Sequence, residues 1–308
     1  MPDDRKFQPP TSLGKQCFLE IVQRLAIQEG LQQTKIPSLS FLRASTTSEP
    51  LPAQYEPSIY VIAQGTKIVT LGDKNYIYNS DNYLTASVRL PITGQIIEAS
   101  PDKPYLCVKL RFSADQIAEI VRDTPQLPVA SSRLNSGLSV CKTSAELLSA
   151  MTRLVSLLET PQDIPFLAPL IIREILYRIL HDENSQLILQ LALGSERAVS
   201  ISKAITIINQ DYAEPLKINE LAKSINLSPS ALHHQFKRVT AMSPLQYQKK
   251  IRLQEARRLL FAESLEAAEV GYQVGYESPS QFSREYAKMF GLPPIRDVKR
   301  LRESVGTM

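Results

Sequence analysis

One pattern occurs twice near the C-terminal end of the chain, at a constant offset of fifty residues. Residues 228–244 and 278–294 both begin with Ser-Pro-Ser and end on a proline. Apolar positions coincide between the copies: Leu232 matches Phe282 and Phe236 matches Tyr286, whereas the positions between them differ. A shared core with a divergent surface is what two copies of a recognition module need. The repeat therefore predicts a duplicated helical module that binds specific DNA sequences.

The positive charge is concentrated in the segment that holds the repeat. Residues 200–308 contain 16 Lys and Arg against 11 Asp and Glu, whereas the preceding 199 residues contain 19 against 20. A phosphate-binding domain requires such an excess. A solvated basic surface without a partner is the alternative, and the repeat favours DNA.

Composition places the chain among globular proteins with two domains. It has 308 residues, of which 43% are hydrophobic and 21% charged. The start, Met1-Pro2-Asp3-Asp4, lacks the apolar stretch of a signal peptide, and charges interrupt the most apolar segment, 166–180. Three widely spaced cysteines imply no disulfide framework. We expect a cytoplasmic protein without a membrane partner.

The N-terminal half has the pattern of short strands followed by helices. Residues 58–63, 67–71 and 76–78 are rich in β-forming residues and separated by glycine-containing turns, and residues 106–112 alternate in polarity. This predicts a small barrel or jelly roll. Residues 145–159 and 167–181 then predict an antiparallel helical pair that closes the domain or dimerises it.

Each copy of the repeat predicts a helix-turn-helix. In the first, residues 218–224 form the first helix, and Ser228 and Pro229 start the second. In the second, the first helix spans 265–270, and Ser278 and Pro279 start the second helix. The side chains expected to face DNA are Ser230, His233, His234, Lys237, Arg238, Ser280, Gln281, Ser283, Arg284 and Lys288.

These residues are expected to differ in role. Arg284 suits a bidentate contact to guanine, and Gln281 one to adenine. The lysines, together with Arg238, are assigned to phosphates, and this group includes Lys249 and Lys250. Residues 245–261 between the copies predict one helix about 25 Å long. Such a helix would place the two recognition helices in successive major grooves, about 34 Å apart.

The segments 242–247, 252–260 and 274–284 resemble the DNA-binding domain of the AraC/XylS family of bacterial transcription regulators. Residues 56–65, 70–73 and 98–101 resemble the effector domain paired with it. The resemblance implies an α+β fold. Residues 1–194 would form a cupin-like β-barrel with a helical dimerisation pair, and residues 195–308 an all-α domain of seven helices with two helix-turn-helix units. It also implies promoter DNA, RNA polymerase, a small-molecule effector and a second copy of the chain as partners. Asp297-Val298 stand where the family carries a Tyr-Arg pair.

An enzyme is the alternative from another class, because barrels of this kind also hold metal centres. The only histidines are His181, His233 and His234, outside the strand region, so we expect no metal and no cofactor. Neither catalytic residues nor effector-binding residues are indicated. A barrel that only dimerises is a further alternative. Cys107 alternates with Lys109 and Arg111, which would lower its pKa and suit thiol sensing; an ordinary strand thiol is the other reading.

Overall fold

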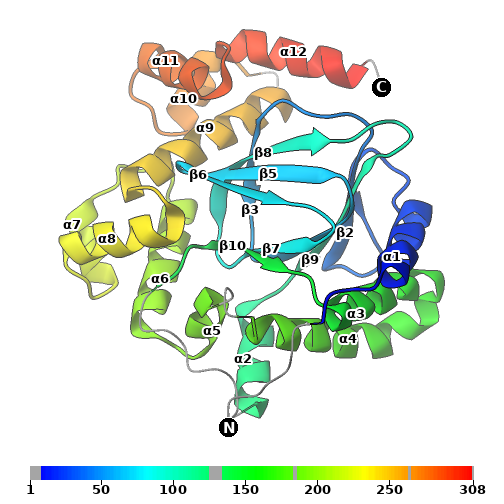
Figure 1. Cartoon of the computed structure of the whole chain (residues 1–308). Helices are drawn as coiled ribbons and strands as arrows, with labels where there is room; N and C mark the ends of the chain where they lie inside the picture. The colour runs from blue at the N-terminus through cyan, green and yellow to red at the C-terminus, as the bar shows by residue number, and fades with distance from the viewer. Residues whose placement is uncertain (1–7, 125–133, 183–185, 263–264, 307–308) are drawn as a thin grey trace. The chain divides into compact units, whose positions relative to one another are not determined.

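The computed structural model describes residues 8–124, 134–182, 186–262 and 265–306 (Figure 1). The chain divides into two compact units, one made of residues 1–51 and 55–199 and the other of residues 52–54 and 200–308. The assignment of effector binding to residues 1–194 and of DNA binding to residues 195–308 stays a prediction. No described helix is long and apolar enough to cross a membrane.

Two β-sheets form the centre of the first unit. The six-stranded sheet has the order β1 (Gly30–Gln33), β2 (Leu39–Ala44), β9 (Tyr105–Arg111), β4 (Ser58–Gln64), β7 (Asn82–Ala86) and β10 (Leu138–Lys142). The four-stranded sheet has the order β3 (Leu51–Tyr55), β8 (Leu90–Glu98), β5 (Thr66–Leu71) and β6 (Lys74–Tyr78). The α+β class and the cupin-like character are confirmed, although the strands form two sheets and not one closed barrel.

Local turn chemistry explains the hairpin of β5 and β6. Leu71 pairs with Lys74, which leaves Gly72 and Asp73 as a two-residue loop. Gly72 has φ +64°, the left-handed conformation that such hairpin loops need and that glycine adopts at no steric cost. The tight turn predicted here from the sequence is confirmed.

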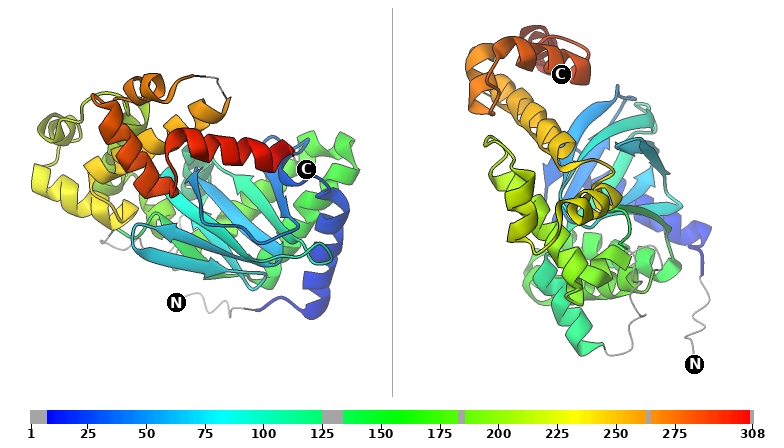
Figure 2. Two further views of the ribbon diagram at one scale, coloured as in Figure 1. Left: turned by 90° about the horizontal axis from the view of Figure 1, so that it is seen from above. Right: turned by 90° about the vertical axis from the view of Figure 1, so that its left-hand side faces the viewer.

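Helices α1 (Ser12–Leu25), α3 (Ala145–Ser156) and α4 (Ile164–Leu180) pack on the outer face of the six-stranded sheet (Figures 1 and 2). Leu106, Val108 and Leu110 of β9 contribute to the same buried core as Met151 of α3 and Ile175 of α4. The predicted helical pair is therefore confirmed. Its first helix ends three residues early, and two 3-10 turns, Leu157–Glu159 and Pro161–Asp163, lead into α4. Helices α2 (Ala114–Asp123) and α5 (Gln186–Ala192) complete the unit.

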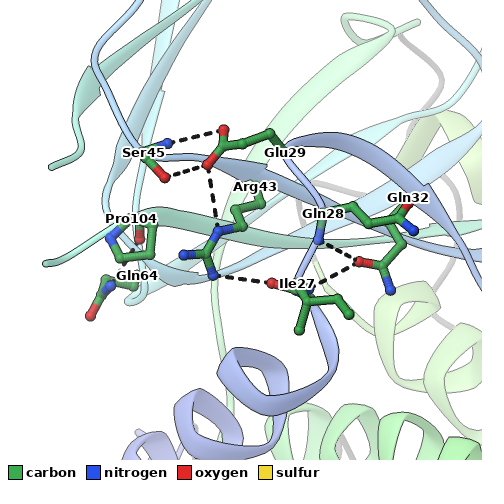
Figure 3. A network of polar contacts seen from close by, with 9 residues as sticks. Ile27, Gln28, Glu29, Gln32, Arg43, Ser45, Gln64 and Pro104 are labelled. Atoms are coloured by element: carbon green, nitrogen blue, oxygen red, sulfur yellow. Dashed lines mark hydrogen bonds and ion pairs between the residues drawn. The ribbon is translucent and has the colours of Figure 1, made fainter. Parts of the chain in front are cut away.

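A polar network attaches the segment between α1 and β1 to β2 (Figure 3). The Nη1 atom of Arg43 donates to the carbonyl of Ala26 at 3.1 Å, and its Nε lies 3.5 Å from Oε1 of Glu29. The side-chain oxygen of Gln32 accepts from two successive backbone N–H groups of the same segment, both at 3.0 Å. These bonds satisfy backbone groups that follow the end of α1.

The C-terminal part of the chain is helical. Its elements are α6 (Glu196–Gln210), α7 (Ile218–Ser224), α8 (Pro229–Thr240), α9 (Pro244–Ala262), α10 (Ala267–Gln273), α11 (Pro279–Phe290) and α12 (Pro294–Gly306). In Figure 1, α9 runs between the pair α7–α8 and the group α10–α12. The described part of the C-terminal region thus contains the seven helices that the resemblance implies.

Candidate nucleic-acid interface and ligand site

The recognition helices α8 and α11 begin in the same way. The hydroxyl of Ser228 accepts from the backbone N–H of Ala231 at 3.2 Å, and that of Ser278 accepts from Gln281 at 3.3 Å. A proline occupies the first turn of each helix, where its missing N–H has no partner to lose. Both predicted caps are confirmed.

The turns that precede these helices differ in length. The left-handed residue is Asn226, with φ 56°, in the first copy and Gly275, with φ 92°, in the second. The equivalent bonds, Leu227 N–H to Ala222 and Tyr276 N–H to Gly271, are related by 49 residues and not by fifty. The second copy therefore contains one extra residue before its cap. The first helix predicted at 265–270 is wrong: α10 spans Ala267–Gln273, which are the residues of α7 moved on by the same 49 positions.

The inner faces of the two recognition helices are matched. Leu232 and Phe236 of α8, and Phe282 and Tyr286 of α11, are fully buried. Phe236 meets Tyr247 of α9 edge-on at 5.4 Å between ring centroids, and Phe282 meets Tyr286 at 5.6 Å. The shared pattern of the repeat is thus the core of the fold.

The outer faces carry the residues that were expected to contact DNA. Positions four residues apart lie in one row on a helix, so α8 presents Ser230, His234 and Arg238, and α11 presents Ser280, Arg284 and Lys288. The exposed residues of the predicted set are Ser230, His233, His234, Lys237, Arg238, Ser280, Gln281, Arg284 and Lys288. Ser283 is only half-exposed. Contact of these side chains with DNA stays a prediction.

Helix α9 separates the two modules. It has 19 residues, Pro244–Ala262, against the predicted 245–261, and is about 28 Å long at ~1.5 Å per residue. Its buried side includes Tyr247, Ile251, Ala256 and Leu259, as the sequence indicated.

Arg252 of α9 holds the turn between α10 and α11 in place, which the sequence did not indicate. Its guanidinium donates to the carbonyl of Gly275 at 2.7 Å. Three further bonds, of 2.6–3.0 Å, reach the carbonyls of Tyr212, Ala213 and Glu214 in the loop after α6. The central helix therefore fixes the entry to α11.

Glu285 of α11 lies at the centre of a second polar group that the sequence did not indicate. Lys249 Nζ and the hydroxyl of Tyr276 each lie 2.8 Å from its carboxylate, and Gln281 Nε2 lies 3.4 Å away. Burial pushes the pKa of Glu285 upward, but hydrogen bonds from Lys249, Tyr276 and Gln281 outweigh it and hold this pKa below its ordinary value. The ammonium of Lys249, assigned above to a phosphate, is thus paired within the protein.

Asp297 occupies a buried position at the start of α12. Its carboxylate accepts from Arg257 of α9 at 2.7 and 3.0 Å and from the hydroxyl of Tyr286 at 3.0 Å. Arg257 also lies 4.6 Å from the ring centre of Phe290. At the position where the resemblance implies Tyr-Arg, this chain has an internal ion pair that joins three helices.

A tyrosine cluster lies between the two sheets of the first unit. It consists of Tyr55, Tyr60, Tyr78 and Tyr105, all buried. Tyr55 and Tyr60 stack at 4.4 Å. Among the described residues, the hydroxyls of Tyr55, Tyr78 and Tyr105 have no hydrogen-bond partner in regular geometry, and they interact with one another and with Cys107. A buried hydroxyl without a partner costs about 1–3 kcal/mol, so this region is a candidate site for a polar ligand.

Two lysines accompany the tyrosine cluster. Lys67 Nζ lies 5.9 and 5.8 Å from the ring centres of Tyr55 and Tyr105, and Lys109 Nζ lies 5.8 Å from that of Tyr60. Neither lysine forms an ion pair with another residue in the described part of the chain. Burial lowers the pKa of Lys109. The cluster is thus bordered by positive charge that an anionic ligand would complement.

Cys107 lies beside this cluster and is fully buried. Burial raises the pKa of its thiol to about 11, which outweighs the opposing effects of Tyr105, Lys67 and Lys109. The expectation of a polar strand face with a lowered thiol pKa is therefore wrong. Cys107 lies two residues from Lys109 on β9 and therefore on the same face of the strand. The Cys107 side chain points between the two sheets and not into water.

Comparison with known proteins agrees with this architecture. The profile described as "AraC-type transcriptional regulator N-terminus" matches residues 35–187, and that described as "Helix-turn-helix domain" matches residues 221–300. Together they cover both the sheet region and the two helix-turn-helix units. The chain belongs to the AraC/XylS family of transcription regulators.

Curated relatives match over part of their length. The lactose operon transcription activator of Staphylococcus xylosus is 34% identical over 90 residues, which are 29% of this chain and 32% of that protein. The regulator GbdR of Pseudomonas aeruginosa is 31% identical over 118 residues, 38% of this chain and 32% of that protein. The chain therefore spans about a third of the length of these relatives.

Solved structures with the same fold cover nearly the whole chain. Fatty-acid-bound ToxT from Vibrio cholerae superposes with a TM-score of 0.54 at 12% identity and covers 85% of this chain and 93% of ToxT. Its apo K231A variant gives 0.55 at 13% identity, over 88% and 98%. At this identity the likeness shows the fold alone.

Proposed function

We propose that the chain is a sequence-specific DNA-binding transcription regulator that a small molecule controls. The observation that carries this proposal is the pair of matched exposed rows, Ser230-His234-Arg238 and Ser280-Arg284-Lys288, on two recognition helices joined by α9. Two such rows suit two successive major grooves of one DNA duplex. The unlike central residues, His234 and Arg284, imply an asymmetric site for each monomer.

The exposed residues divide by chemistry. Arg284 is suited to guanine and Gln281 to adenine, whereas Lys237, Arg238 and Lys288 are suited to phosphates. Ser230, Ser280, His233, His234 and the half-exposed Ser283 complete the proposed surface. The basic excess of residues 200–308 supports this division.

Selection from random duplexes followed by footprinting tests the proposal. We expect protection of two adjacent major-groove segments. Arg284→Ala should relax the preference at one base pair by about 1–3 kcal/mol, and Lys288→Ala should weaken binding equally across sequences. Binding that ignores sequence would contradict the proposal.

The proposed effector site is the tyrosine cluster with Lys67 and Lys109, and the proposed effector class is an organic anion such as a carboxylate. Unpartnered hydroxyls offer hydrogen bonds and the two ammonium groups offer charge. ToxT, a protein of the same fold, has been solved with a bound unsaturated fatty acid, which supports a carboxylate. Control of DNA binding then requires unequal affinity of the ligand for two arrangements of the protein.

Thermal unfolding with a panel of carboxylic acids tests this site, with their methyl esters as uncharged controls. A bound acid should raise the melting temperature and change tyrosine fluorescence, which is observable because the chain has no tryptophan. Lys67→Met should abolish the shift, whereas Lys74→Met, an exposed lysine of the same sheet, should retain it. If no acid raises the melting temperature, the proposed carboxylate site is contradicted, and dimerisation is left as the alternative role of the unit.

A second copy of the chain is the proposed partner of α4. Phe166 and Leu170 of this helix are 77% and 64% exposed, and Leu167 is 44% exposed. A contiguous exposed apolar row of this kind suits a protein interface. Leu170→Glu should convert a dimer into a monomer in analytical ultracentrifugation, and an unchanged mass would contradict the proposal.

RNA polymerase is a third proposed macromolecular partner, beside DNA and a second copy of the chain, since the matched relatives include a transcription activator. The site of action is then the cytoplasm, where bacterial DNA lies. We propose no catalytic activity, because the matched relatives are regulators. Transcription in vitro from a selected site, with and without the protein, tests the partnership with RNA polymerase. Turnover on a panel of substrates would contradict the proposed lack of catalytic activity.

A further inference from the structure

The group around Glu285 suggests how one base is specified, and this inference depends on the proposed DNA binding. We propose that Glu285 is a positioning residue that orients the side-chain amide of Gln281 to recognise adenine, while Lys249 neutralises Glu285 and does not bind phosphate. Glu285 itself contacts no base.

The direction of the Gln281 amide follows from the chemistry of its partner. A carboxylate only accepts hydrogen bonds, so the atom of Gln281 that faces Glu285 at 3.4 Å is the NH2 group. One N–H is thereby used. The carbonyl oxygen and the second N–H remain for an external partner.

That remaining pair matches one base. Adenine presents an acceptor, N7, beside a donor, the N6 amino group, in the major groove. Guanine presents two acceptors, N7 and O6, and a fixed amide with a single free N–H cannot satisfy both. The orientation imposed by Glu285 therefore selects adenine against guanine.

The carboxylate is itself held and neutralised. Lys249 of α9 and the hydroxyl of Tyr276 in the preceding turn both lie 2.8 Å from it, on different oxygens. An uncompensated carboxylate on a recognition helix would repel the DNA phosphates. With Lys249 bound to it, the pair adds no net charge, and the geometry of Glu285 is set by two elements outside α11.

The first module lacks this arrangement. At the positions fifty residues earlier, Ala231 replaces Gln281 and Gln235 replaces Glu285. The side-chain oxygen of Gln235 is buried without a hydrogen-bond partner among the described residues. The positioning group is therefore a property of the second module alone, and its effect should appear at one base pair in one half of the site.

The experiment is selection from random duplexes by the full-length protein and its variants, followed by affinity measurements on the selected site. Gln281→Ala should lower the preference for adenine at one base pair by about tenfold or more. Glu285→Ala should lower it at the same base pair by a similar factor. The double variant should show no further loss, because the two residues act as one unit.

A second readout separates positioning from a structural role. Glu285→Ala frees the ammonium of Lys249, so total affinity at low salt should rise. The slope of log K against log salt should steepen by up to ~0.9, the value for one phosphate contact. Lys249→Met in the same background should remove this change. Glu269→Gln, which changes the net charge equally at an exposed site on α10, should leave the adenine preference intact.

Three results would overturn the proposal. They are an unchanged adenine preference in Glu285→Ala, a loss spread equally over all positions, and a Gln281-dependent position that prefers another base. A wild-type protein that selects no sequence at all would instead contradict the proposed function.

Discussion

Asp297 shows how a single charged residue can serve the fold. Its carboxylate is completely buried and accepts from Arg257 and Tyr286, which come from α9 and α11. Removing one member of a buried ion pair leaves the other charge without compensation, and this cost exceeds the net contribution of the pair. Asp297 therefore stabilises the junction of three helices.

We expect Asp297→Ala to lower the free energy of unfolding by about 3–5 kcal/mol, because the Arg257 guanidinium would stay buried and unpaired. Urea unfolding measures this. Asp211→Ala, at an exposed acidic residue of the same unit, is the control and should stay within about 0.5 kcal/mol of the wild type. Equal effects of the two substitutions would contradict the role assigned to Asp297.

Cys107 gives a prediction about alkaline pH. Its thiol pKa is raised from 9.0 to about 11 on folding, so between these values the unfolded chain loses a proton that the native protein keeps. The unfolded state is favoured as the pH rises, and the free energy of unfolding should fall by ~1.4 kcal/mol per pH unit in this window. Below pH 9 the contribution of the Cys107 thiol to the free energy of unfolding does not change with pH.

The measurement compares unfolding of the wild type and of Cys107→Ala from pH 8 to pH 11. Burial also raises the pKa of Tyr60, Tyr78 and Tyr105, but both proteins share these groups. Because Cys107 also raises the pKa of these tyrosines, the difference between the two curves reports the thiol together with its effect on them. Parallel curves would show that the thiol ionises equally in both states.

At the scale of elements, the turn before α11 is fixed by its backbone. Gly275 has φ 92°, and a Cβ atom there would lie 2.0 Å from the carbonyl oxygen of Ala213. Gly194 also has a positive φ, of 67°, but nothing lies within 4 Å of its Cβ position. A residue with a Cβ atom would therefore be strained at either position because of the positive φ. Only at Gly275 would the Cβ atom also clash with a neighbouring backbone atom.

We expect Gly194→Ala to cost about 1–2 kcal/mol, the penalty of a left-handed residue with a Cβ atom. Gly275→Ala should cost clearly more and should also impair DNA binding, because the loop after α6 must move away from Arg252. Thermal unfolding and a binding assay on the selected duplex measure both effects. Similar losses in the two variants would rule out the close contact as the cause.

Elements with local signals could be predicted from the sequence, and those that depend on distant contacts could not. Ser228 and Pro229 define the start of α8 within a few residues, and the alternation of Leu106, Val108 and Leu110 defines β9. The bonds of Arg252 to Tyr212, and of Lys249 to Glu285, join residues 40 and 36 positions apart. No periodicity encodes such pairs, because they depend on how the helices pack. The division of the strands into two sheets has the same origin.

At the scale of the whole molecule, α9 sets the distance between two binding modules. It contains no glycine, and its only proline is the first residue, so no site for a bend exists within it. Inserting five base pairs between the two contacted segments would turn the second to the opposite side of the duplex. We expect affinity to fall to that of one module alone.

Inserting ten base pairs returns the second segment to the same face of the duplex as the first, but moves it about 34 Å further away. Because α9 cannot lengthen, affinity should stay low, whereas a flexible connection would recover it. Electrophoretic mobility shifts on the three duplexes measure this. Recovery with the ten-base-pair insertion would show that the modules move independently.

The stiffness of α9 has a consequence for the physical state of the DNA. Two recognition helices at a fixed separation fit only a duplex in which the helical twist between the two contacted major-groove segments has one value. Overwinding or underwinding changes that rotation without changing a single base. A promoter bound in the proposed way would therefore respond to torsional stress, and supercoiling would act on the same protein beside the proposed ligand.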